Sequence, residues 1–141
     1  MAMFSSRLVN RIAAVIFPVL ALCGCATSGD IRSTGPKLAE FDAPRPLLDV
    51  YKSEIDMLTT CKVGPVSQIF FLSIDPTFDR DKHTASIALV GTGYLAPHTW
   101  GTIDMETNGS VTHVRIFGEQ RPEFANLGRD VERWANAGSG C

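Results

Sequence analysis

The stretch WGTIDMETNGSVTHVRIF, residues 100–117, decides the fold because it predicts a β-hairpin. Its centre, Asn108-Gly109, matches a two-residue type I′ turn, in which both central residues need a positive φ. With that turn, Ile103 lies opposite Val114, and one face of the hairpin is apolar. The hairpin therefore predicts an antiparallel sheet with one buried face.

Regular elements are also expected on both sides of this hairpin. Apolar residues recur at helical spacing after Pro46 and again between Phe124 and Trp134, and β-branched and aromatic residues are frequent in residues 66–74 and 84–90. The first helical stripe consists of Leu47, Leu48, Tyr51, Ile55 and Leu58. This order predicts an α+β fold: a small antiparallel sheet of about four strands, with an N-terminal and a C-terminal helix packed on one face.

The composition indicates one small globular domain and argues against nucleic acid as a partner. The 141 residues include 13 Lys and Arg against 15 Asp and Glu, which gives a formal net charge of −2. A chain of this length holds one hydrophobic core. Proteins that bind nucleic acid normally carry a basic stripe, which this charge balance does not favour.

The first 24 residues have the features of a secretory signal. Arg7 and Arg11 supply positive charge, and residues 12–22 form an apolar run of 11 residues. A membrane-spanning helix needs about 20 apolar residues, so this run fits the core of a signal peptide instead.

The end of this segment, Leu22-Cys23-Gly24-Cys25, resembles the lipobox of bacterial lipoproteins, which has an aliphatic residue three positions before the modified cysteine and a small residue one position before it. The resemblance implies that signal peptidase II cleaves between Gly24 and Cys25 and that Cys25 carries a diacylglycerol thioether. Cys23 fits less well, because Leu22 is too large for the small-residue position. The resemblance covers residues 1–25 and names no family for the rest of the chain.

The residue after Cys25 indicates the destination. In the sorting rule of Gram-negative lipoproteins, Asp at this position retains the protein in the inner membrane, whereas this chain has Ala26. The resemblance thus implies the periplasmic face of the outer membrane or, in a Gram-positive cell, the outer leaflet of its only membrane. Without residues 1–24 the chain has 11 basic and 15 acidic residues, a net charge of −4, so lipid rather than charge would provide the anchor.

These features divide the chain into three parts. Residues 1–24 are the signal peptide, residues 25–46 are the lipidated cysteine with a flexible tether, and residues 47–141 are a single periplasmic α+β domain. The tether is predicted from its Gly and Pro residues and its lack of sustained periodicity. About 20 flexible residues span roughly 25 Å, which would hold the domain about one domain diameter from the membrane.

Two cysteines stay in the mature chain, Cys61 and Cys141. An exported protein folds in an oxidising compartment, so we expect an intramolecular disulfide that ties the C-terminal helix to the end of the first one. The alternative is a free Cys141 on a mobile Gly-Ser-Gly tail that forms an intermolecular bond.

Asp104 and His113 are the candidate catalytic residues. The expected hairpin register places them opposite each other, and an oriented His–carboxylate pair is one part of a general-base device. A nucleophile is also needed, and the candidates Ser86, Thr102 and Ser110 have no motif around them. A solvent-facing ion pair is therefore the favoured interpretation, and catalysis is the alternative.

Trp100 and Phe117, with Arg115 beside them, form a candidate binding face on the same side of the hairpin. An exposed apolar area with a charged rim, extended by Tyr94, would fit a protein or a glycan. Helices must cover one face of the sheet, and the alternative is that they cover this one.

We expect no metal and no cofactor. The residues Gly91-Thr-Gly-Tyr-Leu-Ala96 match a dinucleotide fingerprint, but a strand rather than a helix is predicted after them. The acidic segment from Asp75 to His83 contains Pro76 and no glycine, unlike a calcium loop, and we interpret it as a solvated loop.

The sequence therefore favours a non-enzymatic envelope lipoprotein, a binding or assembly module. Its expected partners are the lipid bilayer, through acylated Cys25, and an envelope protein or a cell-wall component. The alternative is a small periplasmic hydrolase that uses Asp104 and His113.

Overall fold

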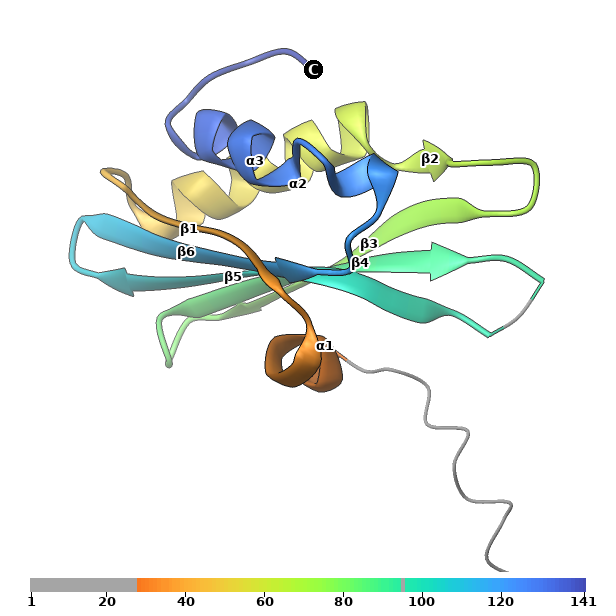
Figure 1. Ribbon diagram of the computed structural model, residues 1–141. Helices are drawn as coiled ribbons and strands as arrows, with labels where there is room; N and C mark the ends of the chain where they lie inside the picture. The colour runs from red at the N-terminus through yellow and green to blue at the C-terminus, as the bar shows by residue number, and fades with distance from the viewer. Residues whose placement is uncertain (1–27, 95) are drawn as a thin grey trace, which may run out of the picture.

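A computed structural model describes residues 28–94 and 96–141 (Figure 1). The fold is α+β, as predicted, with one antiparallel sheet and helices packed against it. The sheet has six strands rather than about four. In chain order the elements are α1 (Ser28–Thr34), β1 (Lys37–Ala43), α2 (Leu47–Cys61), β2 (Gly64–Pro65), β3 (Phe71–Asp79), β4 (Thr84–Thr92), β5 (His98–Asn108), β6 (Val111–Gly118), the 3-10 helix η2 (Pro122–Phe124) and α3 (Leu127–Ala135).

The strands follow the order β1-β6-β5-β4-β3-β2, so the predicted hairpin of β5 and β6 lies inside the sheet. The strand predicted at residues 84–90 is β4. The strand expected at residues 66–74 begins later, at Phe71, and extends to Asp79. The two strands missing from the prediction, β1 and β2, are the edges of the sheet.

Residues 28–43, predicted as part of a flexible tether, are folded. They form α1 and the edge strand β1, which pairs with β6. In β1 the residues Ala39, Phe41 and Ala43 alternate with acidic residues, a strand pattern that the flanking prolines obscured. The folded part of the chain therefore includes residues 28–43, which lie before the boundary predicted at residue 47.

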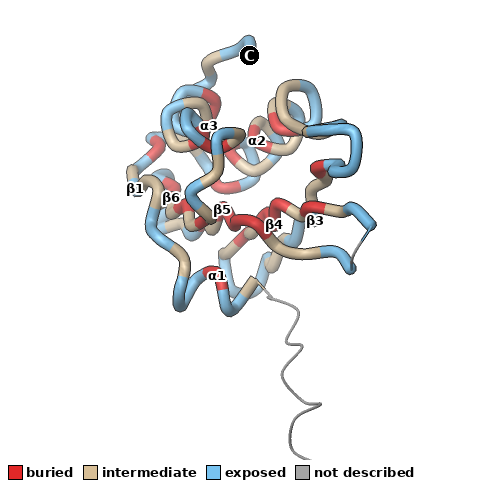
Figure 2. The backbone as a smooth tube through the Cα atoms, turned by 45° about the vertical axis from the view of Figure 1, so that its right-hand side comes forward, coloured by how far each residue is buried: buried red, intermediate tan, exposed pale blue. Residues whose placement is uncertain are grey.

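Helices cover both faces of the sheet. α2 and α3 lie side by side on one face, and α1 lies on the other (Figure 1). The prediction of two helices on one face holds for α2 and α3, whereas α1 was not predicted. Buried residues gather in the sheet and on the sides of α2 and α3 that face it (Figure 2). The core therefore lies between the sheet and these two helices.

The buried side of α2 is rotated relative to the predicted stripe. Leu58 is buried as expected. Val50 and Glu54 are also fully buried, whereas Tyr51 and Ile55 of the predicted stripe are only partly buried. A carboxyl group thus lies in the core, which the spacing of apolar residues did not reveal.

The hairpin turn lies one residue further along the chain than predicted. Gly109 and Ser110 form the two-residue loop, and Asn108 pairs with Val111. Of the two loop residues only Gly109 has a positive φ, 81°, which fits a type II′ turn and corrects the type I′ prediction. Because the turn moves by one residue, every cross-strand partner changes by two residues.

The C-terminal helix is interrupted where a continuous helix from Phe124 was predicted. Pro122–Phe124 form η2, and α3 begins at Leu127. Gly128 lies where α3 packs on β1, and a Cβ atom there would be 2.8 Å from the Cβ of Ala39. The glycine lowers helix propensity but permits this close approach.

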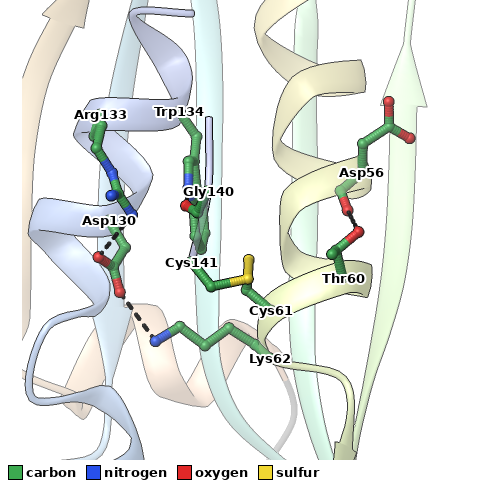
Figure 3. Close-up of a disulfide and its surroundings, with 9 residues drawn as sticks. All are labelled: Asp56, Thr60, Cys61, Lys62, Asp130, Arg133, Trp134, Gly140 and Cys141. Carbon is green, nitrogen blue, oxygen red and sulfur yellow. Dashed lines mark hydrogen bonds and ion pairs between the residues drawn. A yellow bond between two sulfur atoms is a disulfide. The ribbon is translucent and has the colours of Figure 1, made fainter. Parts of the chain in front are cut away.

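The predicted disulfide between Cys61 and Cys141 is present, with the two Cα atoms 5.3 Å apart (Figure 3). Beside it, the indole Nε1 of Trp134 donates a hydrogen bond to the carbonyl oxygen of Gly140 at 3.1 Å. The C-terminal tail is therefore bonded to the end of α2 and to α3.

Candidate functional site

Asp104 and His113 do not form the predicted pair. In the observed register Asp104 lies opposite Arg115, and His113 lies opposite Glu106. The cause is the shifted turn, which moves each partner by two residues. The two candidate catalytic residues instead belong to separate clusters.

The carboxylate of Asp104 is bound by Arg32 of α1 and Ser86 of β4. The Nε and Nη2 atoms of Arg32 donate to its two oxygens at 2.6 and 2.7 Å. Ser86 Oγ donates to Asp104 Oδ1 at 2.8 Å and accepts from Arg32 Nη2 at 2.8 Å. Arg32 bonds both oxygens of the Asp104 carboxylate, so this cluster fixes α1 to the sheet.

His113 is held by two carboxylates of the edge strand β1. Its Nδ1 lies 2.7 Å from Oδ1 of Asp42, and its Nε2 lies 3.0 Å from Oε1 of Glu40. The hydrogen bond with Asp42 raises the pKa of His113, against the smaller effect of burial, and Glu40 raises it further. When the ring is protonated, both of its nitrogens donate to these carboxylates, and it then has no lone pair for general-base catalysis.

The remaining candidate nucleophiles are not placed for catalysis. Thr102 is fully buried, and its hydroxyl has no hydrogen-bond partner in the described part of the chain. Ser110 is exposed in the β5–β6 turn. Within the described part of the chain, no serine or threonine hydroxyl is hydrogen-bonded to His113. The structure therefore does not bring a nucleophile and a base together at this histidine.

The predicted binding face of Trp100, Arg115 and Phe117 is not one surface. The residues on either side of Trp100 pair with two consecutive residues of β4, so Trp100 itself has no partner on β4. Trp100 is therefore the extra residue of a β-bulge in β5. The indole packs over Gly91, where a Cβ atom would lie 2.0 Å from the ring. Trp100 is thus in the core, 4% exposed, with the guanidinium of Arg121 3.8 Å from its ring centroid.

The other two members of that face lie on the α1 side of the sheet. Arg115 forms a long ion pair with Glu106, 3.4 Å between Nη2 and Oε2. Phe117 alternates with the buried Ile116 and is itself only half-buried. The bulge, which turns Trp100 to the opposite side, is the reason that the predicted patch fails.

A different apolar surface is present at one end of the sheet. It consists of Ile69, Phe70 and Phe71, from the β2–β3 connection and the start of β3, and Tyr94, from the β4–β5 connection; we call it the apolar end. Their exposed fractions are 48%, 39%, 45% and 89%. Both connections lie at the same end of the sheet (Figure 1). Within the apolar run Ile69–Leu72 only Leu72 is buried.

The two loops of the apolar end are held in place by specific contacts. Ser67 Oγ accepts hydrogen bonds from the backbone N–H groups of Ile69 and Phe70 at 3.3 and 3.2 Å. A Cβ atom on Gly93 would lie 2.8 Å from the carbonyl oxygen of Ile69, so the loops touch there. The ring of Phe70 meets Trp100 edge-on, with centroids 5.9 Å apart. The exposed side chains therefore stand on an ordered base.

The apolar end is also free of acidic residues. No Asp or Glu occurs in residues 57–74 or in residues 82–103, although the chain has 15. The nearby Glu119 is paired, with Oε1 2.7 Å from Nε2 of His98 and Oε2 3.3 Å from Nη1 of Arg121. This long absence of acids is the sequence signal that could have found the surface.

The opposite end of the sheet is ionic. An open hollow of about 500 Å³ there is lined by Val111 and by polar and charged side chains. We call this region the ionic end, after its titratable residues Asp42, Lys82, His83, Glu106 and His113. The β3–β4 and β5–β6 turns lie at this end (Figure 1). The acidic segment before His83 is a turn in which Asp79 accepts the backbone N–H of Lys82 at 3.0 Å.

Glu54 is the titratable group that the sequence analysis missed. It is fully buried on α2, and neither carboxyl oxygen has a hydrogen-bond partner among the residues that the structure describes. Burial raises the pKa of Glu54 to about 9, although Arg45 lowers it in part. The side chain is therefore protonated at neutral pH.

Comparison with known proteins gave no matching family model, curated protein or solved structure. Cys25 and the predicted lipobox lie outside the described residues. Within those residues, no helix is long and apolar enough to cross a membrane. The same residues contain no group of three His, Cys, Asp or Glu side chains that could hold a metal ion.

Proposed function

We propose that this chain is a lipid-anchored envelope lipoprotein whose folded domain is a binding module, with the apolar end as its contact surface. One observation carries the proposal: four of the six exposed large apolar side chains of the described residues stand together on two adjoining loops. Contiguous exposed apolar area of this kind marks a site of interaction with a protein or a membrane.

The depletion of charge supports the same assignment. The centres of binding surfaces are poor in charged residues and rich in aromatic ones. The apolar end has three aromatic rings and no acidic residue in either loop. A solvated loop end would instead carry charges, as the ionic end does.

The anchor is proposed from the lipobox resemblance, in which Cys25 is the acylated residue. The helix α1 begins only three residues later, at Ser28. A lipoprotein with this connection would work at the membrane surface, on the periplasmic face of the outer membrane if the cell is Gram-negative. The separate bonding of Asp104 and His113 supports a binding role over the hydrolase alternative.

The proposal is tested by photo-crosslinking in cells. A photo-reactive amino acid replaces Tyr94 at the apolar end and, as the matched control, Val111 at the far turn, which is 38% exposed. We expect an adduct with an envelope component at position 94 and little at position 111. Equal adducts at both positions, or none at either, would contradict the assignment of the apolar end.

The anchor has its own test. Cys25→Ser should leave the protein without acyl chains and unprocessed by signal peptidase II, as seen by mass spectrometry of the intact chain. Normal acylation of this variant would overturn the lipoprotein assignment.

A further inference from the structure

We infer that the apolar end contacts the same bilayer that holds the acylated Cys25. The domain is then attached to its own membrane at two places, the lipid anchor and the apolar end. This inference rests on the proposed anchor and names the partner of the proposed contact surface.

The chain between anchor and fold is short. Cys25 and the first residue of α1, Ser28, are three residues apart. A fully extended chain gains at most about 3.6 Å per residue, so the start of α1 lies within roughly 10 Å of the acylated cysteine. The stand-off of a long tether is therefore absent, and the domain stays beside the lipid surface.

The α1 side of the sheet is held nearest to the membrane, because α1 is fixed to that face. Ile31 is buried there, and Arg32 is bonded to Asp104 on β5. α2 and α3 lie on the opposite face (Figure 1). Phe71 points to the α1 side, since its neighbour Leu72 is buried in the core below the helices and side chains alternate along a strand. One ring of the apolar end therefore faces the membrane side.

The shape and chemistry of the apolar end fit a lipid interface. Tyr94 stands almost fully outside the protein surface, with 89% of its area exposed. Aromatic side chains with a polar tip are enriched at the boundary between headgroups and acyl chains. Because the two loops have no acidic residue, an anionic headgroup would not repel them.

The position of the charges sets the same orientation. The ionic end has the carboxylates of Asp42 and Glu106 beside its open hollow. Contact of that end with lipid would remove water from charged groups, which is costly. With the apolar end on the lipid, these groups stay in water.

Tethering favours the bilayer over a soluble partner or a second copy. Because α1 begins three residues after the acylated Cys25, the domain stays close to the bilayer and meets it at a high effective concentration. A protein partner must reach the same side chains in competition with the lipid. Both alternatives are separate outcomes of the test.

The test uses the full lipidated chain in vesicles of phosphatidylcholine, alone and mixed with phosphatidylglycerol. An environment-sensitive fluorophore is attached to Tyr94→Cys and, as the control, to Val111→Cys. Both variants keep the Cys61–Cys141 disulfide. We expect the label at position 94 to shift to the blue and to be quenched by spin-labelled lipid several-fold more than the label at position 111.

A second pair of variants tests whether the apolar side chains themselves bring the label at position 94 into contact with lipid. Ile69→Ser with Phe71→Ser should return the label at position 94 toward a water-like spectrum. Leu48→Ser, which removes a side chain of similar exposure from α2, should not. No loss of lipid contact in the first variant would overturn the role of these loops.

The remaining outcomes separate this inference from the proposed function. Equal, water-like labels on a protein that is still anchored would overturn bilayer contact and leave the lipoprotein assignment standing. A protein adduct at position 94 in cells would also overturn bilayer contact, in favour of a protein partner. A blue shift at position 94 that disappears when the protein is diluted in the membrane would overturn it in favour of a second copy. Failure of the protein to stay on the vesicles would contradict the anchor itself.

Discussion

The two ends of the sheet are built from the same kind of connection but differ in how their side chains are bonded. At the ionic end, His113 has a carboxylate partner on each ring nitrogen, and Asp79 is bonded to Lys82. At the apolar end, Ile69, Phe71 and Tyr94 are each more than two-fifths exposed although the loops that carry them are ordered.

The difference shows where a partner is needed. The charged side chains at the exposed turns pair with one another and stay in contact with water, so the ionic end needs no binding partner. Exposed aromatic rings contribute favourable free energy only when a partner removes water from them. Substitutions in the core and at each end of the sheet test this contrast.

The largest expected effect is in the core, at Glu54. The folded state keeps its proton until about pH 9, whereas the unfolded chain loses it near pH 4. The free energy of unfolding should therefore fall by about 1.4 kcal/mol per pH unit between roughly pH 5 and pH 8. Glu54→Gln has no such proton, so its denaturant unfolding should lack this decline. Parallel pH profiles of the two proteins would contradict a protonated Glu54.

Two glycine substitutions compare the ends directly. Gly91→Ala puts a Cβ atom 2.0 Å from the ring of Trp100, and overpacking of this kind costs about 2–3 kcal/mol. Gly109→Ala at the far turn meets no atom but has a φ of 81°, which costs about 1 kcal/mol. Chemical denaturation measures both losses. A smaller loss at Gly91 than at Gly109 would show that the base of the apolar end is not tightly packed.

Arg32 tests whether α1 is an independent attachment. Arg32→Ala removes the bonds to Asp104 and Ser86 and should cost about 1–2 kcal/mol. Hydrogen exchange should quicken in α1 and stay unchanged in the β2–β3 loop. Arg115→Ala, which removes only a 3.4 Å contact with Glu106, is the matched control and should cost less. Equal changes in both regions would mean that α1 and the apolar end are not independent.

The smallest effect is expected at His113. Its pKa is raised in the folded state, so its contribution to stability is complete below about pH 6.5 and is lost as the pH rises through the folded pKa. Because the group is partly exposed, the contribution should stay under about 1 kcal/mol. His113→Gln should therefore be less stable than the parent at pH 5.5 and equal to it at alkaline pH, by urea unfolding. A difference that grows with pH would contradict the bridging imidazolium.

Local sequence patterns predicted most of the helices and strands but not which residues pair across the strands. The helix after Pro46, the strand from Thr84 and the disulfide followed from spacing and from the compartment expected for the chain. α1 and β1 were missed because glycine and proline around two short elements read as a tether. Pairing with β6 is what makes β1 a strand, and a tertiary contact of that kind leaves only a weak local pattern.

The candidate sites failed for a related reason. A turn displaced by one residue moved His113 from Asp104 to Glu106, and one extra residue in β5 turned Trp100 into the core. Neither shift changes the composition of the hairpin, so the sequence favoured the wrong neighbours. The exposure of Phe70 and Phe71 depends on where β3 begins, which a continuous apolar run does not reveal.

The central claim, that the apolar end is covered in the cell and the ionic end is free, is tested most directly by thiol accessibility. Tyr94→Cys and Val111→Cys proteins are exposed to a membrane-impermeant maleimide in permeabilised envelopes and again after detergent extraction. Our account predicts that Cys at position 94 reacts slowly in the envelope and rapidly in detergent, while Cys at position 111 reacts rapidly in both. Rapid reaction at position 94 in the permeabilised envelope, before detergent is added, would contradict this expectation.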